Sequence, residues 1–292
     1  MKVLVLGASG MIGNAMLRVL SEKPDWTVIG TVRAESDKFR FPEPIASQIV
    51  MGVDLADHDT LVRLFRDQKP DAVVNCAGVT KHLAAGNNPL TAILLNALLP
   101  HRLAELCGMI GARLIQISTD CVFSGARGRY KETDAVDAQD IYGRSKVLGE
   151  VSGPGLITLR TSTIGHELHT RYGLLEWFLS QIRCKGFTRA VFSGLPSVVF
   201  AQVVRDIVLP DRSLSGLYHV AAEPISKADL LAMIACAYGR TDIKIVPDDE
   251  FAIDRSLDAS HFFSATGYRA PSWTEMIDTM HDDHEEGINR HV

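Results

Sequence analysis

Residues 2–20 read KVLVLGASGMIGNAMLRVL, and this stretch decides the fold. Its short apolar run predicts a buried strand, and the periodic apolar residues at its other end predict a helix. Between them, Gly7, Gly10 and Gly13 form a Gly-x-x-Gly-x-x-Gly turn. Glycine there lets backbone N–H groups approach a pyrophosphate, which then lies at the positive N-terminus of the helix. The stretch therefore predicts a dinucleotide-binding turn, and the alternative is a turn that only allows close helix packing.

Strand and helix patterns continue to alternate beyond this unit. Such alternation predicts a parallel sheet with helices on both faces, an α/β fold of the Rossmann-type, doubly wound class. Strands are predicted at residues 26–32, 47–53, 71–77, 113–119 and 156–162, and helices at 59–68, 89–111 and 141–150.

The chain is predicted to have two interleaved parts. Residues 1–162 form the NAD(P)-binding Rossmann domain. Residues 163–292 have a looser pattern of mostly helices with short strands between them, and we assign them to a smaller C-terminal substrate-binding lobe. No low-complexity linker marks the boundary between the two parts.

Composition and charge are those of an ordinary globular protein. Hydrophobic residues make up 46% and the formal net charge is −5, which argues against a nucleic-acid partner. We find no signal-peptide pattern and no apolar run near the roughly 20 residues that span a bilayer. Five scattered cysteines without a Cys-x-x-Cys pair fit reduced thiols. We expect a cytoplasmic protein without a membrane segment.

Two histidine-containing stretches raise the question of a metal. His166 and His169 in HELH lack the spacing of a zinc-protease helix and a third ligand. His281 and His284 lie in the charged segment 281–292, which we interpret as a solvated, fraying terminus. No metal site is predicted.

The stretch IYGRSKVLGE at residues 141–150 places Tyr142 and Lys146 on one face of a predicted helix. A free phenol has a pKa of about 10, and a nearby ammonium lowers that pKa toward the range where a general acid works best. Thr119, at the end of a predicted strand, can offer a hydroxyl to the same substrate oxygen. Tyr-x-x-x-Lys pairs also arise by chance, so it is the position after the glycine turn and this strand that indicates proton transfer to a carbonyl.

The second predicted strand bears on the choice of cofactor. It ends without the acidic residue that would accept the ribose 2′-hydroxyl of NAD, and Arg33 follows it. Arginine there favours the 2′-phosphate of NADP, and the alternative is a solvated surface residue. We therefore predict NADPH, with NADH as the alternative. Asp54 and the NCAG stretch at 75–78 end the next strands, at the sheet edge where a cofactor binds.

Together these patterns resemble the extended short-chain dehydrogenase/reductase superfamily, and within it the dTDP-4-dehydrorhamnose reductases and related nucleotide-sugar reductases. The resemblance spans nearly the whole chain in the expected order. Its segments are GASGMIG, NCAGVT, LNALLPHRLAELC, ISTDCVFSG, YKETD, YGRSKVLGE, LRTSTIG, SGLYHVAAEPISKADLLAMI, SLDASHF and PSWTEMI.

The resemblance implies a catalytic set of Thr119, Tyr142 and Lys146. Tyr142 would donate the proton, Lys146 would bind the nicotinamide ribose and lower the pKa of the tyrosine, and Thr119 would hydrogen-bond the substrate carbonyl. Asn96 falls where the superfamily holds an asparagine near the active site, and its alternative is a buried polar residue bonded to backbone.

The remaining predicted contacts belong to the cofactor and the substrate. The cofactor set is Gly7, Ser9, Gly10, Met11, Ile12, Gly13, Arg33, Asp54, Leu55, Cys76, Ala77, Gly78 and Lys146. The substrate set is Asp120, Cys121, Trp177, Arg205 and Arg255. The two arginines suit a diphosphate or a surface ion pair, and the tryptophan suits a hexose face or a hydrophobic core.

Three segments depart from the reductase pattern, and one of them is the loop GHELHTRYGLLEWFLSQ at residues 165–181, which is not the usual sequence of these reductases. Cys121 follows Asp120 where these reductases usually carry tyrosine, and the absence of glutamate at 121 argues against a dehydratase. The segment FAIDRSLDAS at 251–260 lacks their Arg-Pro start. The identity of the sugar therefore stays open.

The predicted function is NADPH-dependent reduction of a nucleotide-linked 4-keto-6-deoxyhexose in deoxysugar and polysaccharide biosynthesis. A homodimer is compatible with the sequence. One alternative is an NAD-dependent nucleotide-sugar epimerase. The other is a non-catalytic regulatory subunit that keeps the reductase fold but binds a partner enzyme.

Overall fold

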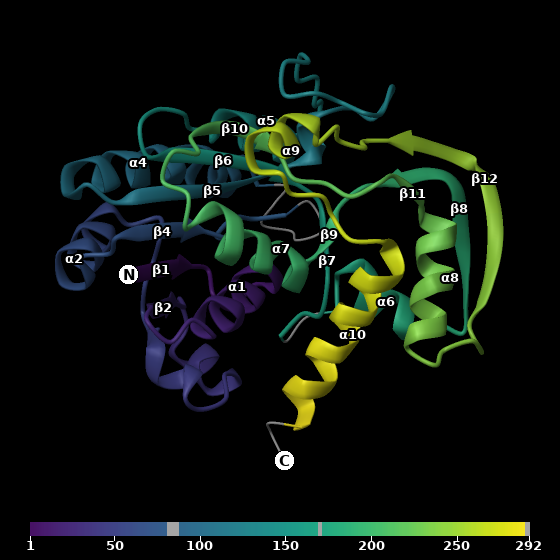
Figure 1. The fold of residues 1–292 in the computed structure, drawn as a ribbon, viewed down its shortest axis with the longest axis horizontal. Helices are drawn as coiled ribbons and strands as arrows, with labels where there is room; N and C mark the ends of the chain where they lie inside the picture. Colours follow the sequence, from purple (N-terminus) through teal and green to yellow (C-terminus); the bar gives the residue numbers. More distant parts are fainter. Residues whose placement is uncertain (81–87, 169–170, 290–292) are drawn as a thin grey trace.

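A seven-stranded parallel sheet forms the centre of the protein and confirms the predicted Rossmann-type α/β fold (Figure 1). The computed structural model describes residues 1–80, 88–168 and 171–289. The strand order is β10-β6-β5-β4-β1-β2-β3, so the chain winds outward in both directions from a switch point between β1 and β4. The strands are β1 (Lys2–Leu6), β2 (Thr27–Thr31), β3 (Ile49–Val50), β4 (Ala72–Asn75), β5 (Arg113–Thr119), β6 (Leu156–Thr161) and β10 (Gly216–His219).

Helices cover both faces of the sheet, and each face has its own hydrophobic core. On one face α1 and α7 pack together with α10, and on the other α2 and α4 pack against the sheet. The helices around the sheet are α1 (Met11–Ser21), α2 (His58–Gln68), α3 (Pro89–Ala92), η4 (Ile93–Leu98), α4 (Leu99–Ile110), α5 (Ile141–Leu148), α7 (Ser197–Val203), η6 (Val204–Val208), α9 (Ser260–Thr266) and α10 (Trp273–Asn289). Short helical turns are η1 (Glu35–Arg40), η2 (Ile45–Gln48) and η5 (Asp120–Val122).

Strand β1 explains why the apolar run KVLVL is continuous. Val3 and Val5 belong to the core under α1, whereas Leu4 and Leu6 belong to the core under α2 and α4. Successive side chains of a strand point to opposite faces, so a strand that is covered on both faces must be apolar at every position.

The C-terminal lobe contains more strand than the sequence pattern predicted. Its three-stranded sheet has the order β11-β8-β12. Strands β7 and β9 form a separate two-stranded pair. Only short strands were expected in this part of the chain, which was wrong, because two strands that were not predicted have 10 and 11 residues. The elements are β7 (Thr163–Ile164), α6 (Leu174–Leu179), β8 (Arg183–Phe192), β9 (Leu195–Pro196), β11 (Ile225–Ser226), α8 (Lys227–Ala237) and β12 (Lys244–Asp254).

The two predicted parts of the chain share the main sheet. Strand β10 comes from beyond residue 162 and pairs in parallel with β6, and α7 packs on α1. The boundary at residue 162 stays a prediction.

One long helical stretch corrects the prediction that no apolar run approaches the length of a bilayer. Among the described residues, Pro89–Ile110, with 22 residues, is long and apolar enough to cross a membrane by length and composition. Leu99 and Leu103 of this stretch are buried in the core with β1. Packing against the sheet therefore explains why the side of this helix that carries Leu99 and Leu103 is apolar.

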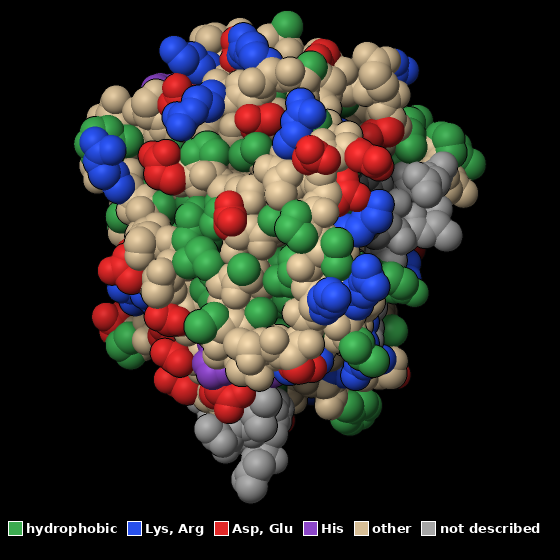
Figure 2. Space-filling model, turned by 90° about the vertical axis from the view of Figure 1, so that its right-hand side faces the viewer, with side chains coloured by type: hydrophobic (Ala, Val, Ile, Leu, Met, Phe, Trp, Pro, Cys, Tyr) green, Lys and Arg blue, Asp and Glu red, His purple; other side chains and the backbone are tan. Residues whose placement is uncertain are grey.

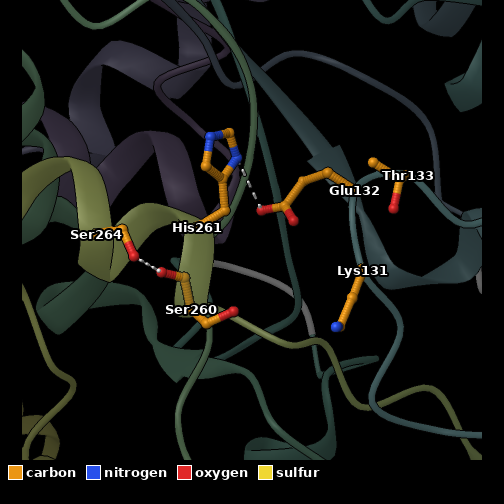
Figure 3. Close-up of a pocket in the computed structure, with 6 residues that line it drawn as sticks. All are labelled: Lys131, Glu132, Thr133, Ser260, His261 and Ser264. Atoms are coloured by element: carbon orange, nitrogen blue, oxygen red, sulfur yellow. Dashed lines mark hydrogen bonds and ion pairs between the residues drawn. The ribbon is translucent and has the colours of Figure 1, made fainter.

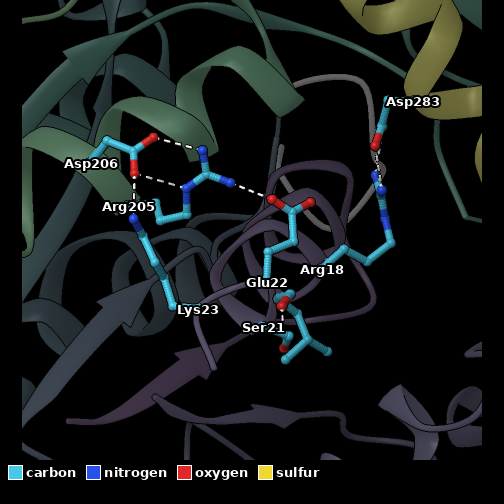
Figure 4. Close-up of polar contacts among 8 residues, drawn as sticks. Arg18, Ser21, Glu22, Lys23, Arg205, Asp206 and Asp283 are labelled. Carbon is cyan, nitrogen blue, oxygen red and sulfur yellow. Dashed lines mark hydrogen bonds and ion pairs between the residues drawn. The ribbon is translucent and has the colours of Figure 1, made fainter. Parts of the chain in front are cut away.

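Helix α10 corrects, for residues 281–286, the interpretation of segment 281–292 as a fraying terminus, and residues 290–292 lie outside the described residues. Asp283 forms a bidentate ion pair with Arg18 of α1 at 2.5 and 2.8 Å (Figure 4). His284 stacks on His166 with ring centroids 3.6 Å apart, and burial lowers the pKa of His284. His166 in turn contacts Glu176 at 2.6 Å. The helix is thus packed on both parts of the chain. His169 lies outside the described residues.

Surface charges are mixed on the face drawn in Figure 2. Lys and Arg side chains alternate there with Asp and Glu, and hydrophobic side chains lie between them. The exclusion of polyanions as partners stays a prediction that rests on the net charge of −5.

Candidate active site

The glycines of the turn let β1, α1 and the end of β4 approach each other more closely than residues with a Cβ atom would allow. Gly7 has a φ of +76°, and a Cβ atom on it would lie 2.9 Å from Cα of Ala77. A Cβ atom on Gly13 would lie 2.1 Å from the carbonyl oxygen of Gly7. The close packing that was the alternative explanation of these glycines is therefore present.

The N-terminus of α1 also has the features of an anion site. Among the described residues, no side chain caps α1 at Gly10, and its first turn carries no acid. In contrast, side chains of Asp57, Asn88, Asp140 and Ser226 cap α2, α3, α5 and α8. The first N–H groups of a helix attract anions. The residues present therefore fit a cofactor pyrophosphate at this turn.

The other predicted cofactor residues follow the strand ends in the expected order. Ser9, Met11 and Ile12 lie in the turn and the start of α1, and Arg33 is exposed just after β2. Asp54 and Leu55 follow β3, where Asp54 Oδ1 accepts a hydrogen bond from the Ala56 amide at 3.0 Å. Cys76, Ala77 and Gly78 follow β4. Burial raises the pKa of Cys76, which makes it an inert thiol.

Helix α5 carries Lys146 to the carboxyl end of β5. The helix begins after Asp140, whose side chain accepts a hydrogen bond from the Gly143 amide at 2.7 Å. Lys146 is buried, and its Nζ donates to the carbonyl oxygen of Ile117 at 2.7 Å. Burial lowers the pKa of Lys146 to about 8. The ammonium is therefore held at a fixed point beside the last residues of β5.

Tyr142 differs from the prediction in the direction of its pKa shift. The pKa is raised, first because burial disfavours the phenolate, and further by the negative charge of a Cys121 thiolate. A side-chain hydrogen bond with Thr119 lowers it by less. The predicted lowering by Lys146 is wrong in this structure, where the ammonium binds the Ile117 carbonyl instead. At neutral pH Tyr142 therefore keeps its proton, as a proton donor must.

Asn96 lies in a π-helical turn inside the long helix and is buried. Its Nδ2 donates to the Val79 carbonyl and to Ser145 Oγ, each at 3.1 Å, and its Oδ1 accepts from the Val79 amide at 3.0 Å. These contacts match the alternative of a buried polar residue bonded to backbone. They also fix the end of β4 against α5, and a contact with reactants stays a prediction.

The substrate-side predictions Thr119, Asp120, Cys121 and Arg255 come together after β5. Thr119 Oγ1 donates to Asp120 Oδ1 at 3.1 Å and accepts from the Cys121 amide at 3.1 Å. Arg255 Nε donates to the Phe123 carbonyl at 2.7 Å, and its Nη1 lies 3.8 Å from Cys121 Sγ. Residues 132 and 134 positions apart thus meet at one strand end.

Arg205 and Trp177 do not join this group in the contacts of the described residues. Arg205 binds Asp206 and Glu22 (Figure 4). Glu22 directly follows α1, about 16 Å along the helix from the glycine turn. The predicted diphosphate contact of Arg205 is therefore wrong, and its alternative, a surface ion pair, is correct. Trp177 lies on α6 and is 41% exposed.

Sequence reasoning missed a row of polar residues, most of them buried, that connects the end of α5 to β5, β6 and β10. Glu150 accepts hydrogen bonds from Ser118 Oγ at 2.7 Å and from Arg160 Nε and Nη2 at 2.7 Å each. Arg160 Nη1 lies 3.3 Å from Nε2 of His219, and Nδ1 of His219 lies 3.0 Å from the Tyr130 carbonyl. Because arginine can only donate, Nε2 must accept and Nδ1 must carry the proton of a neutral imidazole. Glu150 stands four residues after Lys146 in the quoted stretch, just beyond the end of α5, and this was the available signal.

His219 should make stability depend on pH. Burial lowers the pKa of His219 from 6.5 to about 4, so between these values the unfolded chain binds a proton that the folded protein does not. Stability is therefore lost as the pH falls from 6.5 toward 4. Between pH 6.5 and 4.5 this residue should cost about 2 kcal/mol. Urea unfolding at both pH values should give a loss smaller by that amount for His219→Gln, and an unchanged loss for the exposed control His261→Gln. Equal losses in the two variants would contradict this account.

A cavity of about 330 Å³ lies between residues 131–133 and α9 (Figure 3). Glu132 and His261 face each other across it, with Nδ1 of His261 3.8 Å from Oε1 of Glu132. Glu132 also accepts a hydrogen bond from the His219 amide at 2.7 Å. The YKETD and SLDASHF stretches line this cavity, but none of its six lining residues was among the predicted site residues.

The seven-stranded parallel sheet and the strand-end cluster define an α/β protein of the Rossmann-type class. The model of the RmlD substrate binding domain family matches residues 1–285, and the chain belongs to that family.

Relatives in this family differ in what their names say they do. A probable low-salt glycan biosynthesis reductase, Agl14, of Haloferax volcanii is 28% identical over 268 residues, 88% of this chain and 84% of the relative. The methionine adenosyltransferase 2 subunit beta of Bos taurus is 32% identical over 258 residues, 81% of this chain and 72% of the relative. The crystal structure of a dTDP-4-dehydrorhamnose reductase from Clostridium acetobutylicum has a TM-score of 0.78 at 23% identity and covers 98% of this chain and 100% of that chain.

Proposed function

We propose that the protein is an NADPH-dependent reductase of a nucleotide-linked 4-keto-6-deoxyhexose. The observation that carries this proposal is the convergence of Thr119, Tyr142 and Lys146 at the carboxyl end of β5, on the sheet edge that also holds the glycine turn. In open α/β sheets ligands bind at this edge, outside the strand ends. Membership in a family whose relatives include proteins named as reductases supports the same activity.

The roles of the side chains follow from their protonation and contacts. A bound nicotinamide cofactor, held by the turn at Gly7 to Gly13 and by Lys146, would supply the hydride. Tyr142, protonated at neutral pH, donates its proton to the carbonyl oxygen as that oxygen becomes an alkoxide. Thr119 orients the same oxygen by a hydrogen bond. Lys146, fixed on the Ile117 carbonyl, would donate a hydrogen bond from its ammonium to the nicotinamide ribose.

The activity is tested by absorbance at 340 nm with NADPH or NADH and a panel of nucleotide-linked 4-keto-6-deoxyhexoses. Oxidation of NADPH with one sugar, in a molar ratio of one to one with the alcohol formed, supports the reductase. Tight NADPH binding without oxidation on any sugar of the panel would contradict it. The homodimer and the cytoplasmic location stay predictions.

Arg33 should decide between the two cofactors. It is exposed after β2, where no acid stands to accept the ribose hydroxyl of NADH. Arg33→Ala should weaken NADPH binding by about tenfold, the worth of one exposed charge-assisted contact to phosphate, and leave NADH binding unchanged. Fluorescence titration with both cofactors measures this, with the exposed Arg63→Ala as the matched control. Equal weakening for NADPH and NADH would show that Arg33 does not read the phosphate.

A regulatory subunit is the second candidate, and the similarity to a methionine adenosyltransferase subunit beta favours it. Such a subunit would bind a partner enzyme in a stable complex. Purification from its native source under mild conditions distinguishes the two candidates, because a stoichiometric partner enzyme together with no reductase activity would support the regulatory role.

A further inference from the structure

A polar row crosses the three neighbouring strands β5, β6 and β10. Ser118 of β5 pairs directly with Arg160 of β6, and Arg160 pairs directly with His219 of β10. All three side chains are buried. In parallel strands such partners lie side by side, so their side chains form one line across the sheet. A line of buried polar groups is stable only when every member is hydrogen-bonded.

Glu150 closes this row and joins it to helix α5. It receives three hydrogen bonds of 2.7 Å, one from Ser118 and two from Arg160. Glu150 lies two residues beyond the end of α5 at Leu148, and its amide donates to the Val147 carbonyl at 3.1 Å. Ile117 and Ser118, adjacent in β5, thus hold Lys146 and Glu150 respectively.

We propose that Glu150, held by Ser118 and Arg160, is a positioning residue that keeps Lys146 protonated and fixed on the Ile117 carbonyl. The catalytic meaning of this role rests on the proposed reductase function. The row would also connect Lys146 to His219, whose amide binds Glu132 of the cavity beside α9.

The charges around Lys146 support this role. Burial lowers the pKa of Lys146 to about 8, while the negative charges of Glu150 and of a Cys76 thiolate oppose that shift. Burial keeps the Cys76 thiol protonated, because its own pKa is raised. Glu150 is therefore the one of these two groups that is negatively charged at neutral pH. Arg160 binds Glu150 from β6, so removing the carboxylate would leave a buried guanidinium without its ion-pair partner.

The test follows the protonation of Lys146 directly. The ¹³Cε signal of Lys146 in lysine-labelled protein, assigned by its loss in Lys146→Met, is titrated with pH and without added cofactor or substrate. Glu150→Gln should shift the midpoint down by at least about one pH unit. The exposed control Glu105→Gln should leave it unchanged. An unchanged midpoint in folded Glu150→Gln would overturn the proposal.

A second variant tests the same proposal without leaving an unpaired buried charge that could unfold the protein. Glu150→Gln with Arg160→Gln removes both charges and leaves no buried ion unpaired, and its midpoint should still lie below that of the wild type. A midpoint equal to the wild type would overturn the proposal.

The alkaline limb of kcat/KM for NADPH oxidation should move down by the same shift in these variants. A lowered midpoint in a protein without reductase activity would keep the role of Glu150 and reject the proposed function. If the titration midpoint of Lys146 moves but the alkaline limb of kcat/KM does not, the protonation of Lys146 does not matter for catalysis, and the catalytic part of the proposal is rejected.

Discussion

Tyr142→Phe should reduce kcat/KM for sugar-dependent NADPH oxidation by about 10²- to 10⁴-fold, the usual contribution of a positioned general acid. The phenol is the group that burial keeps protonated beside Thr119. Phenylalanine keeps the ring and its packing, so the loss would come from the missing proton rather than from a change of fold. Steady-state rates and near-ultraviolet circular dichroism of both proteins measure the two parts of this prediction.

The matched control is Tyr172→Phe, because Tyr172 is 62% exposed and is not one of the predicted site residues. It should retain wild-type rates. NADPH binding should also be unchanged in Tyr142→Phe, since no predicted cofactor contact is removed. A Tyr142→Phe enzyme that reduces its sugar at a rate close to that of the wild type would assign the proton donor to another group.

Local patterns predicted the parts of the fold that local physics decides. The apolar run before the glycine turn must form a strand buried on both faces, and Gly7 adopts a positive φ that other residues rarely adopt. Strand β12 was not predicted because its sequence contains Pro247 and the acids at 248–250, which do not alternate with apolar residues. It is an edge strand, where pairing with β8 replaces the hydrophobic signal.

Site residues were predicted where a motif fixes their place in the chain and missed where long-range register does. Tyr142 and Lys146 share one helix, so their spacing was sufficient. Arg205 was chosen for its chemistry alone, and its partner Glu22 lies 183 residues away. Glu150 was passed over because its partners Ser118 and Arg160 become neighbours only through the pairing of β5 with β6. The spacing of these residues in the chain does not predict that strand pairing.

Arg160→Met should lower the free energy of unfolding by about 3–5 kcal/mol, the usual result of removing one partner from a buried ion pair. The Arg160 side chain is 4% exposed and that of Glu150 14%. Without the guanidinium, a carboxylate stays buried with only Ser118 as its donor among the contacts of the described residues, and His219 Nε2 loses its donor. Urea denaturation at pH 7 measures the change.

Two comparisons distinguish the effect of an unpaired buried charge on stability from the effect of losing an arginine side chain. Arg63→Met removes an arginine that is 57% exposed and lies 3.6 Å from Asp57, and it should cost less than about 1 kcal/mol. The double variant Glu150→Gln, Arg160→Gln should recover most of the stability lost in Arg160→Met, because no unpaired charge is then buried. Its Lys146 should nevertheless remain without a carboxylate partner. A double variant that regains stability but not the wild-type pH profile would show that the ion pair has two separate roles, one in the stability of the fold and one in the protonation of Lys146. Equal stability of Arg160→Met and Arg63→Met would show that the ion pair does not stabilise the sheet.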